Sequence, residues 1–198
     1  AGYTAGELIR LLVNHPQVRL AFVHSTSNAG NRIADVHGGL EGDTELRFAD
    51  TCDLASIDVL FLCSAHGESR KWLEANDVPA GVKIIDLAQD FRDESDGFVY
   101  GLPELNRDRI RTAERVANPG CFATAIQLAL LPLAAAGLLT GEVHVTAVTG
   151  STGAGVKPSA TTHFSWRTDN ISVYKAFTHQ HLIEIGRNLR RLQPGFGK

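Results

Sequence analysis

Val116–Leu133, which reads VANPGCFATAIQLALLPL, is the stretch that decides how this chain is organised. Asn118-Pro119-Gly120 ends a short apolar run, and an apolar helical pattern follows without Gly or Pro until Pro132. Cys121 therefore lies at or just before the first turn of a buried helix. Free backbone N–H groups and the helix dipole favour a thiolate there and can hold an oxyanion. We interpret Cys121 as a candidate nucleophile, with a buried structural cysteine as the alternative.

The composition is typical of a globular protein with one large domain or two small ones. The chain has 198 residues, of which 43% are hydrophobic and 21% are charged. A net charge of −3 argues against a nucleic-acid surface, and polar residues, Pro and Gly interrupt every long apolar run, so we expect no membrane span. Three cysteines at unrelated spacings fit a reducing compartment. We therefore expect a cytoplasmic protein with free thiols.

The residues before Cys121 alternate short apolar strands with helices, which predicts an α/β, Rossmann-type domain with a parallel sheet. The Thr4-x-x-Glu7 spacing predicts a capping box and a helix over 5–14. Ligands bind at the carboxyl ends of such strands. We expect strands at 18–24, 57–63 and 82–87, a helix at 68–74, and ligand-binding loops at 25–30, 64–67 and 86–92.

The second half has no such alternation. Residues 142–149 alternate apolar and polar side chains like a strand, 171–174 are a second candidate strand, and 178–192 have a helical apolar face. We therefore predict a dinucleotide-binding domain over 1–117 and a partial α+β catalytic and dimerisation domain over 118–198.

The first glycines and the next loop point to a dinucleotide. Gly2 and Gly6 have the spacing of half a fingerprint turn, although an ordinary tight turn has the same pattern. NAD-binding units place an acid about twenty residues further on. This chain has hydroxyl residues at 25–27 and Arg32 instead, with no acid before Asp35. These groups suit a 2′-phosphate and hence NADP, with a polar surface loop as the alternative.

His179 and His181 open the last predicted helix. Residues i and i+2 do not share a helical face, so we expect no metal bound by this pair. A single histidine acting as acid and base beside a thiol is the better functional interpretation, and a structural histidine is the alternative. Arg92 follows a strand end and is a candidate for binding an anion or for a surface ion pair. The Gly150–Gly155 turn is a candidate phosphate cradle or a plain hairpin.

Several of these motifs together resemble the N-acetyl-gamma-glutamyl-phosphate reductases, NADP-dependent arginine-biosynthesis enzymes of the semialdehyde dehydrogenase superfamily. They are GYTAGELIRLL, STSNAG, GLPELN, VANPGCFATAIQLALLPL, GSTGAGVKP and the His-x-His pair. The resemblance covers nearly the whole chain. It also implies a further strand before Ala1 and further strands after Gln193, so we expect both native termini to be missing.

The resemblance implies a reaction and a set of residues. Cys121 would attack the acyl phosphate and form a thioester, which hydride from NADPH releases as the semialdehyde. The catalytic histidine would be His179, with His181 second, and Glu184 would orient a histidine. Ile183 stands where the family usually has proline, so we expect the backbone geometry of that turn to differ slightly from the family's. Arg92 and Asn118 would contact substrate, and the NADP site would consist of Gly2, Thr4, Ala5, Gly6, Ser25, Ser27, Ser64, Gly153 and Gly155.

Other functions remain open at this point. Aspartyl or aminoadipyl phosphate is an alternative substrate, and a non-catalytic dinucleotide-binding module is an alternative class. The resemblance implies a homo-oligomer, either a dimer or a tetramer, acting on a small acyl-phosphate substrate.

Overall fold

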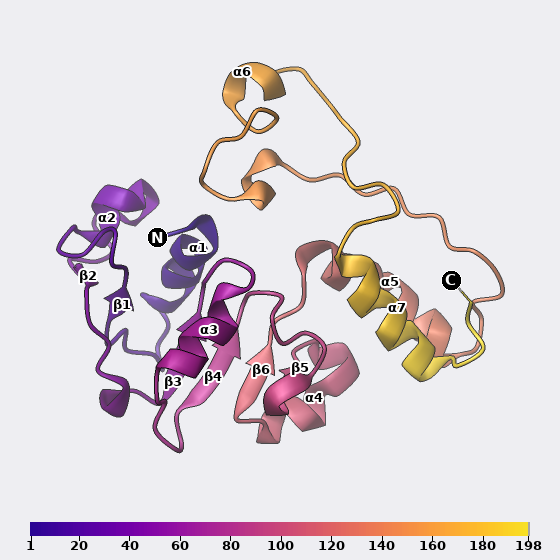
Figure 1. Cartoon of the computed structure of the whole chain (residues 1–198), viewed down its shortest axis with the longest axis horizontal. Coiled ribbons are helices and arrows are strands. Elements are labelled where there is room, and N and C mark those ends of the chain that lie inside the picture. The colour runs from indigo at the N-terminus through magenta and orange to yellow at the C-terminus, as the bar shows by residue number, and fades with distance from the viewer. Residues whose placement is uncertain (198) are drawn as a thin grey trace.

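The computed structural model describes residues 1–197 (Figure 1). The strands are β1 (Val23–His24), β2 (Phe48–Ala49), β3 (Val59–Leu62), β4 (Lys83–Asp86), β5 (Val99–Tyr100) and β6 (Arg115–Ala117). The helices are α1 (Tyr3–Leu12), α2 (Ile33–Val36), α3 (Glu68–Ala75), α4 (Pro103–Thr112), α5 (Cys121–Ala135), α6 (Phe164–Arg167) and α7 (His181–Leu192). Short 3-10 turns lie at Gly38–Leu40, Leu54–Ser56, Ser95–Gly97 and Ser151–Ala154.

The named strands form two parallel sheets, which confirms the predicted α/β class. One sheet contains β1 and β2, and the other has the order β3-β4-β6-β5. Leu62 lies opposite Asp86, and Asp86 lies opposite Ala117. The carboxyl ends of β3, β4 and β6 therefore meet at one edge of the sheet. Cys121 follows β6 directly at this edge, which is where an open parallel sheet binds its ligands.

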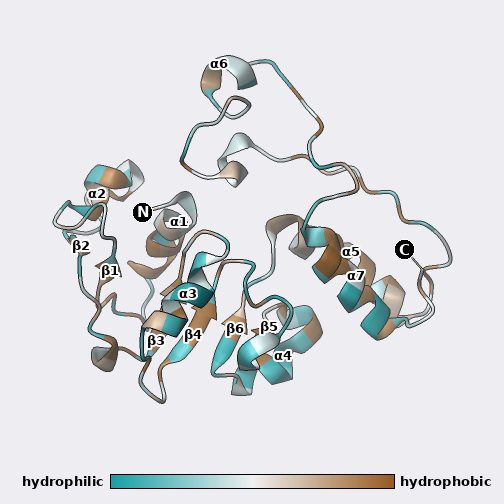
Figure 2. Cartoon of the chain, in the orientation of Figure 1, coloured by the Kyte–Doolittle hydropathy of each residue, from teal (hydrophilic) through white to brown (hydrophobic). Residues whose placement is uncertain are grey.

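Three apolar clusters hold these elements together. The first surrounds β1 and β2, and the second lies between the four-stranded sheet and α3, where Trp72 and Leu73 pack on the strands. The third joins α5 and α7 and includes Tyr100 and Leu102. The colours of Figure 2 agree, because α5 is mainly hydrophobic while the outer helix α4 is mainly hydrophilic. Since Tyr100 and Leu102 belong to the third cluster, the helix pair shares a core with the sheet region, and the domain boundary at 117/118 stays a prediction.

Strand β1 is much shorter than the predicted strand over 18–24. Within residues 1–197, β1 pairs only with β2, and β3 pairs only with β4 among the named strands. A strand with one neighbour has half of its backbone hydrogen-bonding groups without a ladder partner. The missing neighbour explains why only Val23 and His24 keep strand geometry.

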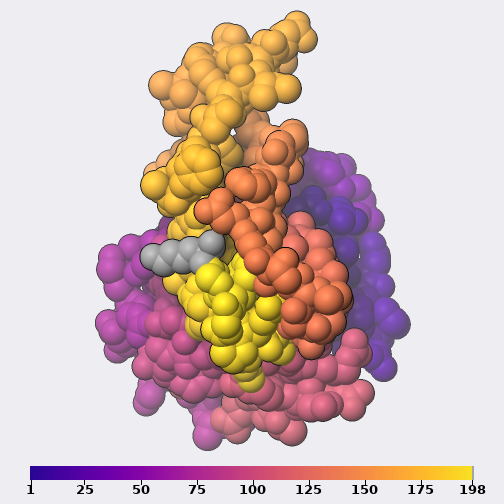
Figure 3. Space-filling view, turned by 90° about the vertical axis from the view of Figure 1, so that its right-hand side faces the viewer, coloured from indigo at the N-terminus to yellow at the C-terminus, as the bar shows by residue number. Residues whose placement is uncertain are grey.

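The two strands predicted after Cys121 are wrong. Residues 142–149 and 171–174 have no assigned strand or helix, and no strand lies in the described part of the chain after β6. Val148 is 85% exposed and Val173 is 87% exposed. Neither segment has a neighbouring strand to pair with, and an alternating pattern alone does not hold a strand in water. In Figure 3 the orange excursion that contains both segments projects from the rest of the molecule.

The capping box predicted at the start of the chain is also wrong. Helix α1 begins at Tyr3, its N-cap is Gly2, and no side chain caps it. Thr4 therefore lies inside the helix, where its hydroxyl is past the N-cap position. No helix among residues 1–197 has the length and the apolar character needed to cross a membrane.

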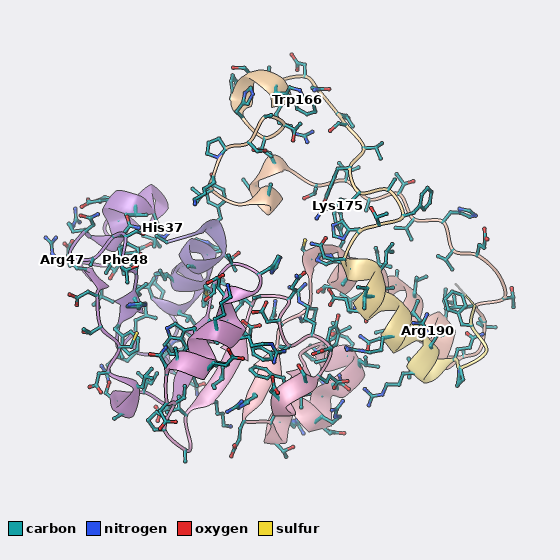
Figure 4. The ribbon with its side chains drawn as sticks, viewed as in Figure 1. His37, Arg47, Phe48, Trp166, Lys175 and Arg190 are labelled. Carbon is teal, nitrogen blue, oxygen red and sulfur yellow. The ribbon has the colours of Figure 1, made fainter. Side chains whose placement is uncertain are left out.

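We expect Gly6→Ala to destabilise the protein. A Cβ on Gly6 would lie 2.6 Å from Nδ1 of His37, whose ring packs near Phe48 (Figure 4). Overpacking of this kind outweighs the better helix propensity of alanine, and the free energy of unfolding should fall by about 1–2 kcal/mol. Urea unfolding measures the loss. Gly39→Ala is the matched control, because nothing lies within 4 Å of its Cβ position; equal stability of the two variants would contradict the prediction.

Candidate active site

Cys121 is the first residue of α5 and is exposed. Asn118 donates its backbone N–H to Asp86 O at 2.7 Å, which extends the sheet ladder beyond β6. Pro119 and Gly120 then turn the chain, and Gly120 is the N-cap in an extended conformation. The position predicted from the Asn-Pro-Gly breaker is therefore confirmed.

Cys121 lies in the first turn of α5, where a helix offers free backbone N–H groups. The first backbone N–H groups of a helix have no partner within it, and the dipole adds positive potential. Both stabilise a thiolate, and both can hold an oxyanion on a carbonyl attacked by it. Burial raises the pKa of the Cys52 thiol and raises that of the Cys63 thiol to about 11, which disfavours a thiolate at either position. Cys121 is thus the thiol best placed for nucleophilic chemistry.

The two histidines lie beside this turn, with their rings in contact. Their ring centroids are 4.4 Å apart, and His181 N donates to Nδ1 of His179 at 3.2 Å. This differs from the sequence expectation, in which both residues sit on one helix and face apart. Helix α7 begins only at His181, so His179 precedes it and folds back. His179 also meets Phe122 and Tyr174 edge to face.

His181 is buried against the residue that precedes Cys121. A Cβ on Gly120 would lie 2.2 Å from Nε2 of His181, so only glycine leaves room for the ring. Burial lowers the pKa of His181 to about 4, and the positive charges of His179, Arg92, His66 and Lys175 add to this effect. Burial and Lys175 also lower the pKa of His179. Both imidazoles are therefore neutral near pH 7 and able to accept a proton.

Glu184 does not contact the histidine rings through any hydrogen bond between described residues. Its buried carboxylate instead accepts from the Tyr100 hydroxyl at 2.6 Å, from Gly120 N at 3.3 Å and from Arg92 at 3.2 Å. No hydrogen bond among the described residues therefore corresponds to the expected role of Glu184 in orienting a histidine. The carboxylate holds the turn before Cys121.

Arg92 lies inside the protein, with every guanidinium nitrogen occupied. Nε donates to Asn118 O at 2.9 Å, Nη1 donates to Glu184, and Nη2 donates to Leu87 O at 3.4 Å. The Asn118 side chain donates to Pro119 O at 3.1 Å. The structure therefore brings Arg92 next to the Cys121 turn, where three of its five N–H groups bond to other residues of the protein.

One residue of the predicted cofactor set, Gly155, lines a cavity of about 250 Å³. Tyr3 from α1 and Gly155 from the glycine-rich turn both line it, although they are far apart in sequence. Gly2, Thr4 and Ala5 flank Tyr3 at the start of α1, and Gly153 lies beside Gly155. Gly6 faces His37 instead, so its lack of a side chain serves helix contact.

The predicted 2′-phosphate loop forms a polar cluster after β1. The hydroxyls of Ser25 and Ser27 are 3.4 Å apart, and the Asn28 amide donates to both. Arg32 does not serve this cluster, because it forms ion pairs with Asp35, Glu41 and Glu45. Arg47 directly precedes β2, and its side chain reaches this loop, where it donates to Gly30 O at 2.8 Å. Ser64 is half-buried just after β3.

Sequence reasoning missed the polar residues beneath Cys121. Gln127 and Asn188 are buried on α5 and α7, and Tyr100 is buried at the end of β5. The available signal was a polar residue at a core position of an apolar helix, because such a group needs a buried partner. Gln127 follows Ala123 by one turn and shows this pattern.

We expect His181 to make stability fall at low pH. The unfolded histidine binds a proton near pH 6.5, whereas the folded one binds it only near pH 4. Stability from the neutral ring is therefore complete above pH 6.5 and is lost as the pH falls toward 4, by at most about 1.4 kcal/mol per pH unit.

Urea unfolding of the native protein and of His181→Gln at several pH values between 7 and 4 measures this loss. The stability difference between the two proteins should shrink as the pH falls. His15→Gln replaces an exposed histidine and is the matched control. A difference between wild type and His181→Gln that does not change with pH would contradict the prediction.

Comparisons with known proteins agree with this architecture. Residues 1–113 match the family described as semialdehyde dehydrogenase, NAD binding domain, and residues 121–196 match its dimerisation domain. The chain is 63% identical over 198 residues to the N-acetyl-gamma-glutamyl-phosphate reductase of Bacteroides thetaiotaomicron, covering 99% of this chain and 62% of that protein. It is 62% identical over 198 residues to the reductase of the same name from Parabacteroides distasonis, again covering 99% of this chain and 62% of the relative.

A third relative, the reductase of the same name from Azobacteroides pseudotrichonymphae, is 64% identical over 190 residues, which is 95% of this chain and 60% of that protein. The chain thus spans about three-fifths of the length of these relatives. Matches to the two domains together extend over nearly every residue described above. This chain belongs to the semialdehyde dehydrogenase family.

Proposed function

We propose that this protein is a reductase that converts N-acetyl-gamma-glutamyl phosphate to N-acetylglutamate 5-semialdehyde in arginine biosynthesis, using NADPH. The observation that carries the proposal is an exposed cysteine at the start of a helix, next to a pair of neutral histidines. The names of the relatives supply the substrate, since each is called N-acetyl-gamma-glutamyl-phosphate reductase. The NAD binding domain family supplies the cofactor class.

The thiolate of Cys121 attacks the acyl carbon, the bond from that carbon to the phosphate oxygen breaks, and a thioester with free phosphate results. The N–H groups at the start of α5 hold the oxyanion during this step. His179 or His181 accepts the thiol proton beforehand and returns it to the Cys121 sulfur when the thioester is reduced and its carbon–sulfur bond breaks. A bound nicotinamide cofactor supplies the hydride that turns the thioester into the aldehyde.

Lys175 is a better candidate than Arg92 for binding the substrate phosphate. Its positive charge lowers the pKa of His66, His179 and His181, and its side chain contacts Gln180, the N-cap of the helix that begins at His181. Lys175 is exposed and donates to Gln180 at 3.0 Å, whereas Arg92 is buried and each of its guanidinium nitrogens already makes one hydrogen bond within the protein. Asn118, which is exposed beside Cys121, completes the substrate-binding set.

We place the cofactor along the line from the polar loop after β1 to the cavity between α1 and the glycine-rich turn. Gly2, Thr4 and Ala5 would face the pyrophosphate at the start of α1, where helix N–H groups bind phosphate, and Gly6 would support this turn from its contact with His37. Ser25, Ser27 and Arg47 would bind the 2′-phosphate of NADP. Ser64 and the turn with Gly153 and Gly155 would border the nicotinamide half.

We further propose that the protein works as a homo-oligomer, a dimer or a tetramer, formed through the part that matches the dimerisation domain. Residues 142–149 and 171–174 fit such an assembly, because apolar side chains in both segments are exposed in the described chain. We place the domain boundary at 117/118, just before the turn that carries Cys121, and we place the enzyme in the cytoplasm.

Replacement of the nucleophile tests the reaction and the substrate together. Cys121→Ser should lower phosphate-dependent NADP reduction with N-acetylglutamate semialdehyde by at least about 10³-fold, because the hydroxyl is a far weaker nucleophile at neutral pH. The assay uses the longest native polypeptide that contains this sequence, with aspartate semialdehyde as the competing substrate. Cys52→Ser is the matched control and should keep wild-type rates.

Turnover with aspartate semialdehyde alone would keep the nucleophile and overturn the substrate assignment. NADP binding without turnover of either substrate would favour a non-catalytic dinucleotide-binding module.

Arg47 tests the cofactor assignment. Arg47→Ala should weaken NADPH binding about tenfold and leave NADH binding unchanged, because a charge-assisted bond to the 2′-phosphate contributes about 1.5–3 kcal/mol. Fluorescence titration with both cofactors measures the ratio. Arg10→Ala removes an exposed arginine that is paired only with Glu7 and serves as the control. An equal loss of affinity for both cofactors would show that Arg47 does not read the 2′-phosphate.

A further inference from the structure

We propose that Tyr100 is a positioning residue for Cys121, acting through Glu184 and Gly120. The inference rests on the proposed function only where kcat is measured. The rate at which an alkylating agent modifies Cys121 tests the positioning role without any substrate. Tyr100 lies on β5, a strand that carries none of the residues assigned to chemistry above.

A chain of hydrogen bonds connects α7, α5 and β5 beneath the Cys121 turn. The Asn188 amide donates to Oε1 of Gln127 at 2.7 Å, and Nε2 of Gln127 donates to the Tyr100 hydroxyl at 2.7 Å. Tyr100 in turn donates to Oε2 of Glu184 at 2.6 Å. Tyr100 and Gln127 have no exposed surface, and Glu184 is only 5% exposed. No member can exchange its partner for solvent.

The direction of each bond follows from the donors and acceptors available. Because the Gln127 carbonyl accepts from Asn188, the Gln127 amide nitrogen faces Tyr100, and it also donates to Ala123 O at 3.0 Å. The Tyr100 oxygen therefore accepts from Gln127, and its proton is directed to Glu184. Burial and the Glu184 carboxylate both raise the pKa of Tyr100, so the phenol keeps this proton.

The same carboxylate oxygen of Glu184 holds Gly120. Oε2 accepts the Gly120 N–H at 3.3 Å, and Gly120 O accepts from Thr124 N at 2.8 Å and from the Thr124 hydroxyl at 3.0 Å. The His181 ring closes the remaining side of Gly120. The N-cap is thus fixed by a carboxylate, by the first turn of α5 and by a histidine ring.

Cys121 follows Gly120 directly, so the position of its sulfur depends on this N-cap. The Tyr100 hydroxyl selects the orientation of the Glu184 carboxylate that reaches Gly120 N, while Arg92 takes the other oxygen. Without the hydroxyl, Oε2 loses its shortest bond and the first turn of α5 loosens. The N–H groups of that turn then lose their fixed positions, and a thiolate or oxyanion held there loses part of its stabilisation.

Tyr100→Phe removes the hydroxyl and keeps the ring. In the longest native polypeptide, we expect alkylation of Cys121 by iodoacetamide at pH 7 to slow at least fivefold, measured by mass spectrometry of the Cys121 peptide. With the acetylated substrate, we expect kcat to fall at least tenfold while KM changes less than twofold. Gln127→Met should change both rates in the same direction.

Gln193→Met is the matched control. Gln193 joins the end of α7 to the loop after α5 through two bonds with Leu139, so its loss weakens the same helix pair away from Cys121. We expect this variant to lower the unfolding temperature and leave both Cys121 readouts at wild-type values.

Unchanged alkylation and kcat in Tyr100→Phe would overturn the proposal, as would an equal effect of Gln193→Met. Slower alkylation in Tyr100→Phe, in a protein whose wild type does not turn over the acetylated substrate, would support the positioning role and reject the proposed reaction. If Tyr100→Phe does not fold, the same alkylation measurement on Gln127→Met decides, since it removes the donor to the same hydroxyl.

Discussion

The buried carboxylate of Glu184 is the interaction on which the arrangement around Cys121 depends. It lies on α7 and joins Arg92, which follows β4, to Tyr100 on β5 and to the N-cap of α5. A buried ion pair contributes little net stability because both charges lose their hydration. Its contribution here is a specific arrangement, since removing Arg92 or Glu184 alone would leave the other as a buried charge without its ion-pair partner. The residues that meet at this carboxylate are far apart in the sequence, from Arg92 to Glu184.

Backbone geometry supplies the chemistry that this carboxylate supports. A parallel sheet directs its strand ends to one edge, and the chain leaving β6 turns at Pro119 and Gly120 into α5. The turn exposes the Cys121 thiol to the unpaired N–H groups of the helix. His181 completes the site because α7 packs against α5, which places a neutral imidazole against Gly120.

The excursion between α5 and α7 shows the opposite behaviour. Its alternating residues have the pattern of a strand, yet the described chain offers them no strand to pair with. Backbone groups without a ladder partner bond to water, and the apolar side chains remain exposed. The same reasoning applies to β1 and β3, each of which pairs on one side only. Whether a segment forms a strand therefore depends more on a neighbouring strand to pair with than on its alternating sequence.

The sequence by itself determined the α/β class, the α5 helix with Cys121 at its start, and the glycine-rich turns, because breaker residues and apolar periodicity act locally. It also indicated that His179 and His181 belong near the thiol. Only the tertiary structure decided that Arg92 is buried against Glu184 and that Tyr100 and Gln127 lie beneath the nucleophile. It also decided that Arg32 pairs with carboxylates, while the Arg47 side chain reaches the loop after β1. These outcomes depend on which residues meet after folding, and hydrogen bonds between residues far apart in sequence leave no periodic signal along the chain.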